Sequence, residues 1–321
     1  MQVRLDKRAR IIDEGGQAYP VDLLRDHTLK QIREKYTDEA GELTLEVGEE
    51  VPDDVVTIGG RVMFLRNTGK LCFTSLQDGF TESSNGERLQ VMLSKALVGE
   101  QALAAWKSDV DLGDFVWVKG FVARSRRGEL SVMATEWKMA SKALRPLPTL
   151  HKELGEETRV RRRYADLVAR EEARQMVRVR AAITRAIRTT LDELGFLEIE
   201  TPILQLVHGG AAARPFNTHL NAFDIGMSLR IALELYLKRA MVGGMDRVYE
   251  MGRVFRNEGI DSNHSAEFTM LEAYMSWGNQ FTIAEVIQQI IVRAADALGG
   301  RQIQTEQGVI DLDGQWEWVH V

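Results

Sequence analysis

The densest group of chemically useful side chains falls within twenty consecutive residues and combines arginines, a histidine and glutamates. Its members are Arg253, Arg256, Glu258, His264, Glu267 and Glu272. Alternation along an extended chain predicts that Arg256 and Glu258 share one face of a strand. It also places Phe268 and Glu272 on one face of a second strand, after a turn at 259–264. Such a hairpin would present a guanidinium, an aromatic ring and carboxylates, a set suited to a phosphate, a base and an amine. The alternative is a salt-bridged surface hairpin that binds nothing.

Several familiar catalytic signatures are missing from the sequence. It contains no phosphate-binding G-x-x-x-x-G-K-[ST] loop, no G-x-G-x-x-G dinucleotide motif and no G-x-S-x-G nucleophile turn. The six histidines are scattered, so no zinc site appears at ligand spacing. Cys72 is the only cysteine, which excludes a disulfide scaffold.

Composition places the chain among ordinary globular proteins. Its 321 residues are 44% hydrophobic and 27% charged, with a formal net charge of −6, and they suffice for two domains. No apolar run is long enough to cross a bilayer, and the charged N-terminus lacks an apolar signal core. We therefore expect a cytoplasmic protein with no membrane partner.

The sequence pattern in the first half of the chain predicts a small β-domain. Five β-rich runs lie between 55 and 141, and a helical stretch at 96–106 follows the third. This order predicts a closed five-stranded barrel of the OB type, although another small antiparallel sheet is the alternative. Residues 1–54 are expected to form an N-terminal helical extension and an acidic linker. Within them, 38–54 holds eight acids and no base, which suggests a solvated loop.

Periodicity becomes helical after a proline-containing linker at 142–158. An apolar stripe from Met176 to Leu194 predicts a long helix that Gly195 ends, and a strand follows before Pro202. A later helix is expected to open at Thr282 with a capping box. These elements would belong to a second domain at 159–321.

The start of this second domain is strongly basic. Residues 159–188 hold ten arginines against three acids. This segment is a candidate surface for an anionic ligand, with a solvent-exposed helical face as the alternative.

Several motifs together resemble one family. The run FRNEGIDSNHSAEFTMLEAY resembles the second signature of class II aminoacyl-tRNA synthetases, and RTTLDELGFLEIETPIL resembles the first. GGAAARPF, followed by ELYLKR and VGG, is similar to the lysine-specific members, and the barrel resembles their anticodon-binding domain. The resemblance implies an α+β chain: an OB-type barrel, then a partial class II synthetase antiparallel sheet flanked by helices.

The resemblance also implies an ATP site. Arg256 would clamp the α-phosphate as the catalytic residue, because a guanidinium stabilises the charge that develops when a carboxylate attacks. Glu258 would accept from the adenine amino group or orient Arg256. His264 would reach the polyphosphate, and Phe268 would stack on adenine.

A lysine site is implied beside it. Glu234 would pair with the ε-ammonium of the amino acid, and Glu272 with its α-ammonium, with Tyr274 packed nearby. Gly210 would let the backbone approach the ligand closely. Two carboxylates suit a diamino acid, because a neutral analogue would leave them unpaired.

Partners follow from the same resemblance. Arg66, Phe73 and Gln90 match anticodon-contacting positions, so tRNA(Lys) is the expected nucleic acid; barrel core is the alternative for Phe73. Pro202 would lie in the interface of a homodimer.

The third class II signature and the carboxylates that hold Mg²⁺ in this family are not found in the sequence. We therefore expect a catalytic domain truncated before that motif. Two hypotheses remain: a lysine–tRNA ligase that uses ATP, or a catalytically incomplete fragment or paralogue that binds tRNA or other RNA. A truncated gene product without a stable fold is a third possibility.

Overall fold

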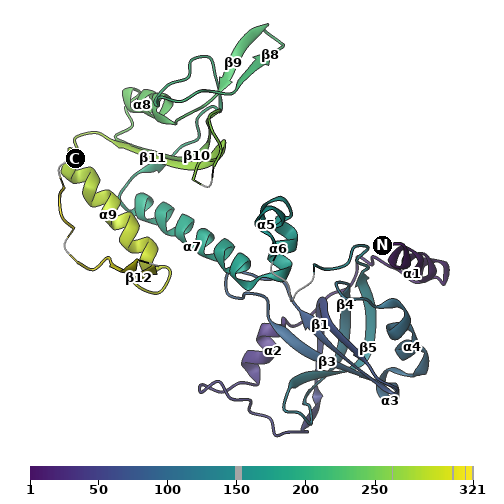
Figure 1. The fold of residues 1–321 in the computed structure, drawn as a ribbon. Coiled ribbons are helices and arrows are strands. Elements are labelled where there is room, and N and C mark those ends of the chain that lie inside the picture. Colours follow the sequence, from purple (N-terminus) through teal and green to yellow (C-terminus); the bar gives the residue numbers. More distant parts are fainter. Residues whose placement is uncertain (149–153, 262, 306, 315, 320–321) are drawn as a thin grey trace. The chain divides into compact units, whose positions relative to one another are not determined.

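A computed structural model gives the fold of the chain (Figure 1). It describes residues 1–148, 154–261, 263–305, 307–314 and 316–319. The chain divides into two compact units, Met1–Arg178 and Val179–Val321. Residues 149–153 of the expected linker lie outside the described residues. The domain limits drawn from the sequence stay a prediction.

The first unit contains a closed five-stranded barrel. Its strands are β1 (Glu50–Asn67), β2 (Leu71–Gln77), β3 (Arg88–Ser94), β4 (Phe115–Arg124) and β5 (Leu130–Ser141), joined in the order β1-β2-β3-β5-β4. The helices α3 (Lys95–Val98) and α4 (Glu100–Asp109) follow the third strand. The predicted OB-type barrel is therefore confirmed.

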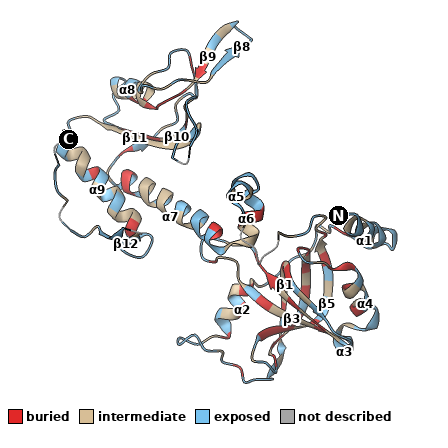
Figure 2. Ribbon diagram, viewed as in Figure 1, coloured by how far each residue is buried: buried red, intermediate tan, exposed pale blue. Residues whose placement is uncertain are grey.

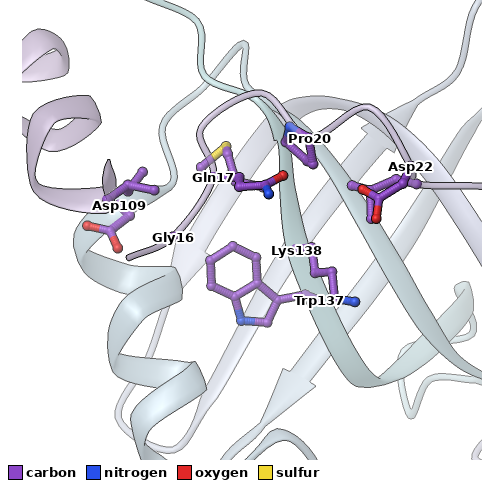
Figure 3. A pocket seen from close by; sticks show the side chains of 10 residues that line it. Gly16, Gln17, Pro20, Asp22, Asp109, Trp137 and Lys138 are labelled. Carbon is purple, nitrogen blue, oxygen red and sulfur yellow. The ribbon is translucent and has the colours of Figure 1, made fainter. Parts of the chain in front are cut away.

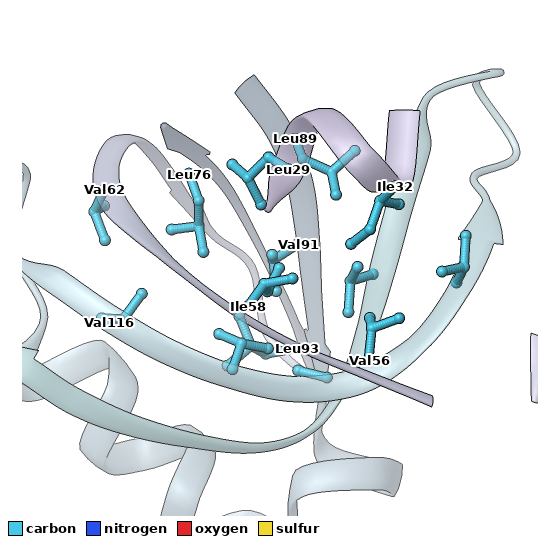
Figure 4. Packing of buried hydrophobic residues seen from close by; sticks show 14 of the residues in the cluster. Leu29, Ile32, Val56, Ile58, Val62, Leu76, Leu89, Val91, Leu93 and Val116 are labelled. Atoms are coloured by element: carbon cyan, nitrogen blue, oxygen red, sulfur yellow. The ribbon is translucent and has the colours of Figure 1, made fainter. Parts of the chain in front are cut away.

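Alternation along the strands builds the barrel core (Figure 2). The buried side chains are aliphatic and mostly β-branched, which suits a pleated surface. They include Val56, Ile58, Val62, Leu76, Leu89, Val91, Leu93, Val116, Val118, Val122 and Val132, each at most 1% exposed (Figure 4). Helix α2 (Leu29–Lys35) adds Leu29 and Ile32 to the same cluster. Each such side chain stabilises the fold by roughly 1.5–3 kcal/mol relative to exposure.

The acidic segment differs partly from the expected loop. Strand β1 begins at Glu50, so the last five residues of 38–54 are strand. Glu50 pairs with Ala123 of β4, and the Asp54 carboxylate accepts from Lys35 Nζ at 2.8 Å. A strand partner and a nearby ammonium thus order acids that composition alone assigned to a solvated loop.

An N-terminal helix, α1 (Gln2–Asp13), is fastened to the barrel by its cations. Arg4 donates to the carbonyl oxygens of Leu112 and Ala143, and Lys7 Nζ lies 2.7 Å from Asp111 Oδ1. The segment after α1 and strand β5 border a hollow of about 410 Å³ whose floor includes Trp137 (Figure 3). The first unit ends with α5 (Glu156–Arg161), α6 (Arg163–Ala169) and the start of α7 (Glu171–Glu193).

The second unit is an α+β assembly, as predicted. Strands β6 (Leu197–Glu198), β10 (Arg247–Phe255) and β11 (Glu267–Met275) form a sheet in the order β11-β10-β6. A second sheet is β7-β9-β8, from β7 (Leu204–Gln205), β8 (Asn217–Leu220) and β9 (Ile225–Leu229). The remaining elements are α8 (Glu234–Val242), α9 (Gln280–Asp296), β12 (Gln302–Thr305) and β13 (Gly308–Asp311).

Helices pack on both faces of the β10–β11 pair. Leu191 of α7 and Val286 of α9 meet Tyr249 on one face. Leu237 of α8 meets Val248 on the other. Because side chains alternate across β11, Phe268 and Tyr274 lie on the α8 face. This face carries the side chains of the candidate site.

Two local predictions were wrong. Strand β10 ends at Phe255, so Arg256 and Glu258 follow the strand rather than sharing its face. Arg256 N still donates to Ala266 O, but the next amide, Asn257 N, donates to Arg214 O outside the hairpin. Helix α9 opens at Gln280 and not at Thr282, because the Asn279 side chain caps it and Thr282 completes the capping box.

In the part of the chain that the structure describes, no helix is both long and apolar enough to cross a bilayer.

Candidate active site and nucleic-acid interface

One short segment, 231–234, leads into helix α8 and contacts most of the predicted site residues. Ile231, Ala232 and Leu233 are buried, which fixes the backbone of the segment. Gly210 lies against it with a φ of +86°. A Cβ at Gly210 would stand 2.8 Å from Glu234 Cβ and 3.1 Å from Ala232 Cβ. Only glycine fits this approach, because both the backbone conformation and the space exclude a side chain.

Two carboxylates and a phenol meet beside this segment. Glu272 Oε1 accepts from Leu233 N at 3.0 Å, and Glu272 Oε2 accepts from the Tyr274 hydroxyl at 2.8 Å. Burial raises the pKa of Tyr274, and the nearby charges of Glu272 and Glu234 raise it further. The hydroxyl therefore stays protonated and holds the Glu272 carboxylate in place.

An ammonium already lies next to these acids. Lys238 Nζ donates to Glu234 Oε1 at 2.6 Å and lies 5.8 Å from the centre of the Tyr274 ring. Carboxylates and an aromatic face together attract an alkylammonium group. The arrangement therefore suits an amine ligand.

Arg256 and Phe268 form the other half of the site. The Arg256 guanidinium lies 5.3 Å from the centre of the Phe268 ring. Its Nε is 3.4 Å from Ile231 O, which connects it to the 231–234 segment. No carboxylate among the described residues pairs with Arg256. Its charge thus remains available to an anion, beside a ring that can stack on a base.

The structure does not bring Glu258 and His264 to this pair. Glu258 is exposed, and its Oε1 accepts from Arg214 N at 3.2 Å. His264 Nδ1 lies 2.8 Å from Asp261 Oδ2 within its own loop. The Asn263 amide and the His264 side chain lower the pKa of Asp261. In the described residues, no hydrogen bond or ion pair joins Glu258 or His264 to Arg256.

A buried polar cluster beneath the site was missed from the sequence. Arg230 Nη1 and Glu250 Oε1 are 2.6 Å apart, and the two residues are only 3% and 4% exposed. Thr201 donates from N and Oγ1 to Glu250 Oε2, and Arg230 Nε donates to Arg253 O at 2.8 Å. A Cβ at Gly252 would lie 2.3 Å from Arg230 Nη2. The only sequence signal was a glutamate between strand residues, followed two positions later by glycine.

The three barrel residues predicted to read RNA border a single groove. Arg66, Phe73 and Gln90 line a space of about 1200 Å³ on the outer surface of the strands. Five further arginines surround it: Arg33, Arg88, Arg124, Arg126 and Arg127. Phe64 lines it too and is 53% exposed, a second aromatic ring that sequence reasoning missed. Aromatic faces among arginines are the usual surface for single-stranded nucleic acid.

The family models match both units. Residues 155–319 match the tRNA synthetases class II (D, K and N), and 56–140 match the OB-fold nucleic acid binding domain. The first match covers more than half of the chain. The chain belongs to the class II tRNA synthetases. The family predicted from the signature motifs is therefore confirmed.

The curated relatives of this class II chain include lysine–tRNA ligases. It is 56% identical to the enzyme of Kineococcus radiotolerans over 318 residues, which cover 98% of this chain and 61% of that protein. It is 53% identical to lysine–tRNA ligase 1 of Mycobacterium tuberculosis, over 100% of this chain and 61% of that protein. It is also 41% identical to the lysylphosphatidylglycerol biosynthesis bifunctional protein LysX of Rhodococcus jostii, covering 27% of it. The chain thus spans 61% of the length of the ligases that it matches.

The predicted first signature of the class lies at an exposed apolar surface. Pro202 is exposed, and it is followed by exposed Ile203, Leu204, Leu206 and Val207. Exposed apolar side chains gathered this closely in the sequence are typical of an association site.

The basic segment 159–188 is largely occupied by contacts within the chain. Arg174 is buried and donates to Asn85 O at 2.7 Å, and Arg163 pairs with Asp166 at 2.6 Å. Arg178 donates to Glu82 O, and Arg188 pairs with Glu198 at 3.0 Å. Much of 159–188 therefore serves contacts within the chain, which neither the anionic-ligand surface nor the solvent-exposed helical face had predicted.

Among the described residues, no three or more histidine, cysteine, aspartate or glutamate side chains lie together so that they could hold a metal ion.

The family resemblance implies lysine as the ligand beside Gly210, and on that expectation Gly210→Ala should weaken lysine binding at least tenfold while leaving the fold largely intact. The new Cβ would force Glu234 or the 231–234 segment to move, and the left-handed backbone would cost roughly 1–2 kcal/mol. Titration calorimetry with lysine measures the first effect and thermal melting the second. Gly226→Ala is a matched control, because no atom lies within 4 Å of a Cβ there. Unchanged lysine affinity in Gly210→Ala would contradict the close approach.

Proposed function

We propose that this chain carries the lysine–tRNA ligase reaction. An oxygen of the lysine carboxylate attacks the α-phosphorus of ATP, and the bond to pyrophosphate breaks to leave lysyl-adenylate. The terminal ribose hydroxyl of tRNA(Lys) then attacks the lysyl carbonyl, and AMP leaves. The observation that carries the proposal is the convergence of Arg256, Glu234 and Glu272 on the 231–234 segment.

Each side chain has a defined task in this reaction. Arg256 binds the α-phosphate and stabilises the charge that grows on it, while Phe268 stacks on adenine. Glu234 takes the ε-ammonium of lysine and Glu272 its α-ammonium, with Tyr274 fixing Glu272. Proximity and electrostatics carry the rate, with no protein nucleophile. Glu258 and His264 would have to move toward ATP from their present contacts.

The family is expected to use Mg²⁺ with ATP, but the described residues supply no cluster of ligands for it.

We place the homodimer interface at Pro202 and the exposed apolar residues that follow it. Burying Ile203, Leu204, Leu206 and Val207 against a second copy would remove them from water. Sedimentation at increasing protein concentration tests the assignment, with Leu206→Asp as the disrupting variant.

Lysine-dependent exchange between ATP and pyrophosphate is the direct test of activation. A folded sample should exchange only when lysine is present. If a cooperatively melting protein shows no exchange at saturating lysine, the catalytic proposal is rejected for this chain.

The barrel groove favours a second candidate function, RNA binding without catalysis. The groove lies wholly within the first unit and does not depend on the adenylate site. Salt-dependent binding of an anticodon hairpin, together with absent exchange, would select this alternative.

Phe73→Ala should weaken binding of an anticodon hairpin by about 1–3 kcal/mol, the usual contribution of one stacked base. Phe73 lines the groove and is only partly buried, so barrel stability should change little. Fluorescence anisotropy with a labelled hairpin measures the effect. Phe115→Ala is the control, since Phe115 belongs to the same barrel but does not line the groove. Equal losses in both variants would show that Phe73 acts through the fold.

A further inference from the structure

Ser131 is a fully buried hydroxyl beneath the groove. It lies on β5, where its Cα partner across the parallel β3–β5 pair is Gln90. Its Oγ donates to Glu129 O at 2.9 Å, and the same Oγ accepts from Gln90 Nε2 at 2.8 Å.

The donor and acceptor roles of the Ser131 hydroxyl in these two hydrogen bonds follow from the groups that it contacts. A serine hydroxyl has one hydrogen, and a backbone carbonyl can only accept, so the hydrogen is committed to Glu129 O. Toward Gln90, Ser131 can then act only as an acceptor, which selects the amide nitrogen and repels the amide oxygen. The Gln90 amide therefore has one fixed orientation, in which Nε2 faces Ser131 and Oε1 is the amide atom left to accept from a base in the groove that Gln90 lines.

We propose that Ser131 is a positioning residue that fixes the amide of Gln90, so that the groove selects uracil over cytosine. The inference rests on the proposed reading of tRNA by the barrel and deepens it. It assigns a role to a buried residue that touches no RNA itself.

The selected base follows from the two pyrimidine edges. Uracil and cytosine have the same size and stack alike, so stacking on Phe73 cannot separate them. At the centre of the pairing edge, uracil carries an N3–H donor and cytosine carries an N3 acceptor. With the amide fixed, Gln90 Oε1 accepts from the uracil N3–H but faces a lone pair on cytosine. A freely turning amide would instead rotate by half a turn and satisfy cytosine.

Discrimination between uracil and cytosine matters for the recognition of a tRNA that carries lysine. The codons AAA and AAG require uracil at the second and third anticodon positions, and a cytosine at either position would specify another amino acid. An amide of fixed orientation therefore protects the reading of one of these uracils.

Ser131→Ala tests the proposal through a ratio of affinities. Anticodon hairpins with UUU, and with each single uridine changed to cytidine, are titrated against wild type and variant. Wild type should prefer UUU over one of the cytidine hairpins. In Ser131→Ala that preference should fall by about fivefold to tenfold, chiefly because the cytidine hairpin binds better. Ser131→Thr keeps the hydroxyl and should keep the preference.

Two further measurements separate positioning from a structural effect. Ser131→Ala should add nothing to Gln90→Ala, because both act through the same amide. N3-methyluridine in a UUU hairpin removes the donor and should weaken binding to wild type by about as much as cytidine does. This measurement needs no variant, and it tests the reading of the uracil N3–H on which the role of Ser131 depends.

The outcomes are distinct. Equal weakening of all hairpins by Ser131→Ala, or no effect of N3-methylation at any uridine, would overturn the inference while RNA binding stands. If the wild-type protein binds no hairpin, the proposed RNA reading fails first, and the role of Ser131 fails with it.

Discussion

Arg256→Ala is expected to lower lysine-dependent ATP–pyrophosphate exchange by roughly 10²–10³-fold, the usual effect of removing one donor that stabilises transition-state charge. The guanidinium is not paired with any carboxylate in the described residues, so its removal should not destabilise the fold through a stranded partner. The loss should appear mainly in the maximal rate, because the interaction strengthens as charge develops.

Two variants make this result specific. Arg256→Lys keeps the charge but not the planar fork, and it should recover only part of the rate. Arg253→Ala is the matched control: Arg253 lies just before Arg256 on the same hairpin, is exposed, and pairs loosely with Glu267 at 3.5 Å. Comparable losses at both positions would show that general charge, and not Arg256, governs the rate.

Glu250→Ala should lower the free energy of unfolding by about 3–5 kcal/mol, the typical cost of stranding one partner of a buried ion pair. Arg230 would keep its charge at 3% exposure, without the carboxylate that lies 2.6 Å from it. Urea denaturation followed by circular dichroism measures the change.

A surface pair provides the contrast. Glu267→Ala breaks the exposed contact with Arg253 and should change stability by less than about 1 kcal/mol. Gly252→Ala offers an independent route to the same cluster, because its Cβ would displace the Arg230 guanidinium without removing any polar group. If Glu250→Ala proves as mild as Glu267→Ala, the Arg230–Glu250 pair is not a main support of this unit.

Sequence patterns predicted the elements whose causes are local. The barrel strands followed from alternating β-branched residues, and the long helix ends where Gly195 adopts a φ of +80°. The motif resemblance brought Gly210, Glu234 and Glu272 into one proposed site, and the structure places them around a single segment.

The features that could not be predicted from the sequence depend on contacts between residues far apart along the chain. Strand β10 stops short of Arg256, and the next backbone amide, Asn257 N, donates to Arg214 O from a distant part of the chain. Glu250 is buried because Arg230 and Thr201 reach it from two other segments. The arginines of 159–188 suggested an anionic ligand, but many are used by carbonyls and acids of the protein. No local pattern encodes such pairings.

The contact between Lys238 and Glu234 has a consequence for the proposed lysine site. A diamino acid that binds at Glu234 would have to replace the Lys238 ammonium with its own, so the Glu234 carboxylate would be paired with a cation both before and after binding. The net gain is only the difference between two similar ion pairs, which favours easy release over tight retention. An amino acid with an uncharged side chain could not replace the Lys238 ammonium, which would stay bound to Glu234.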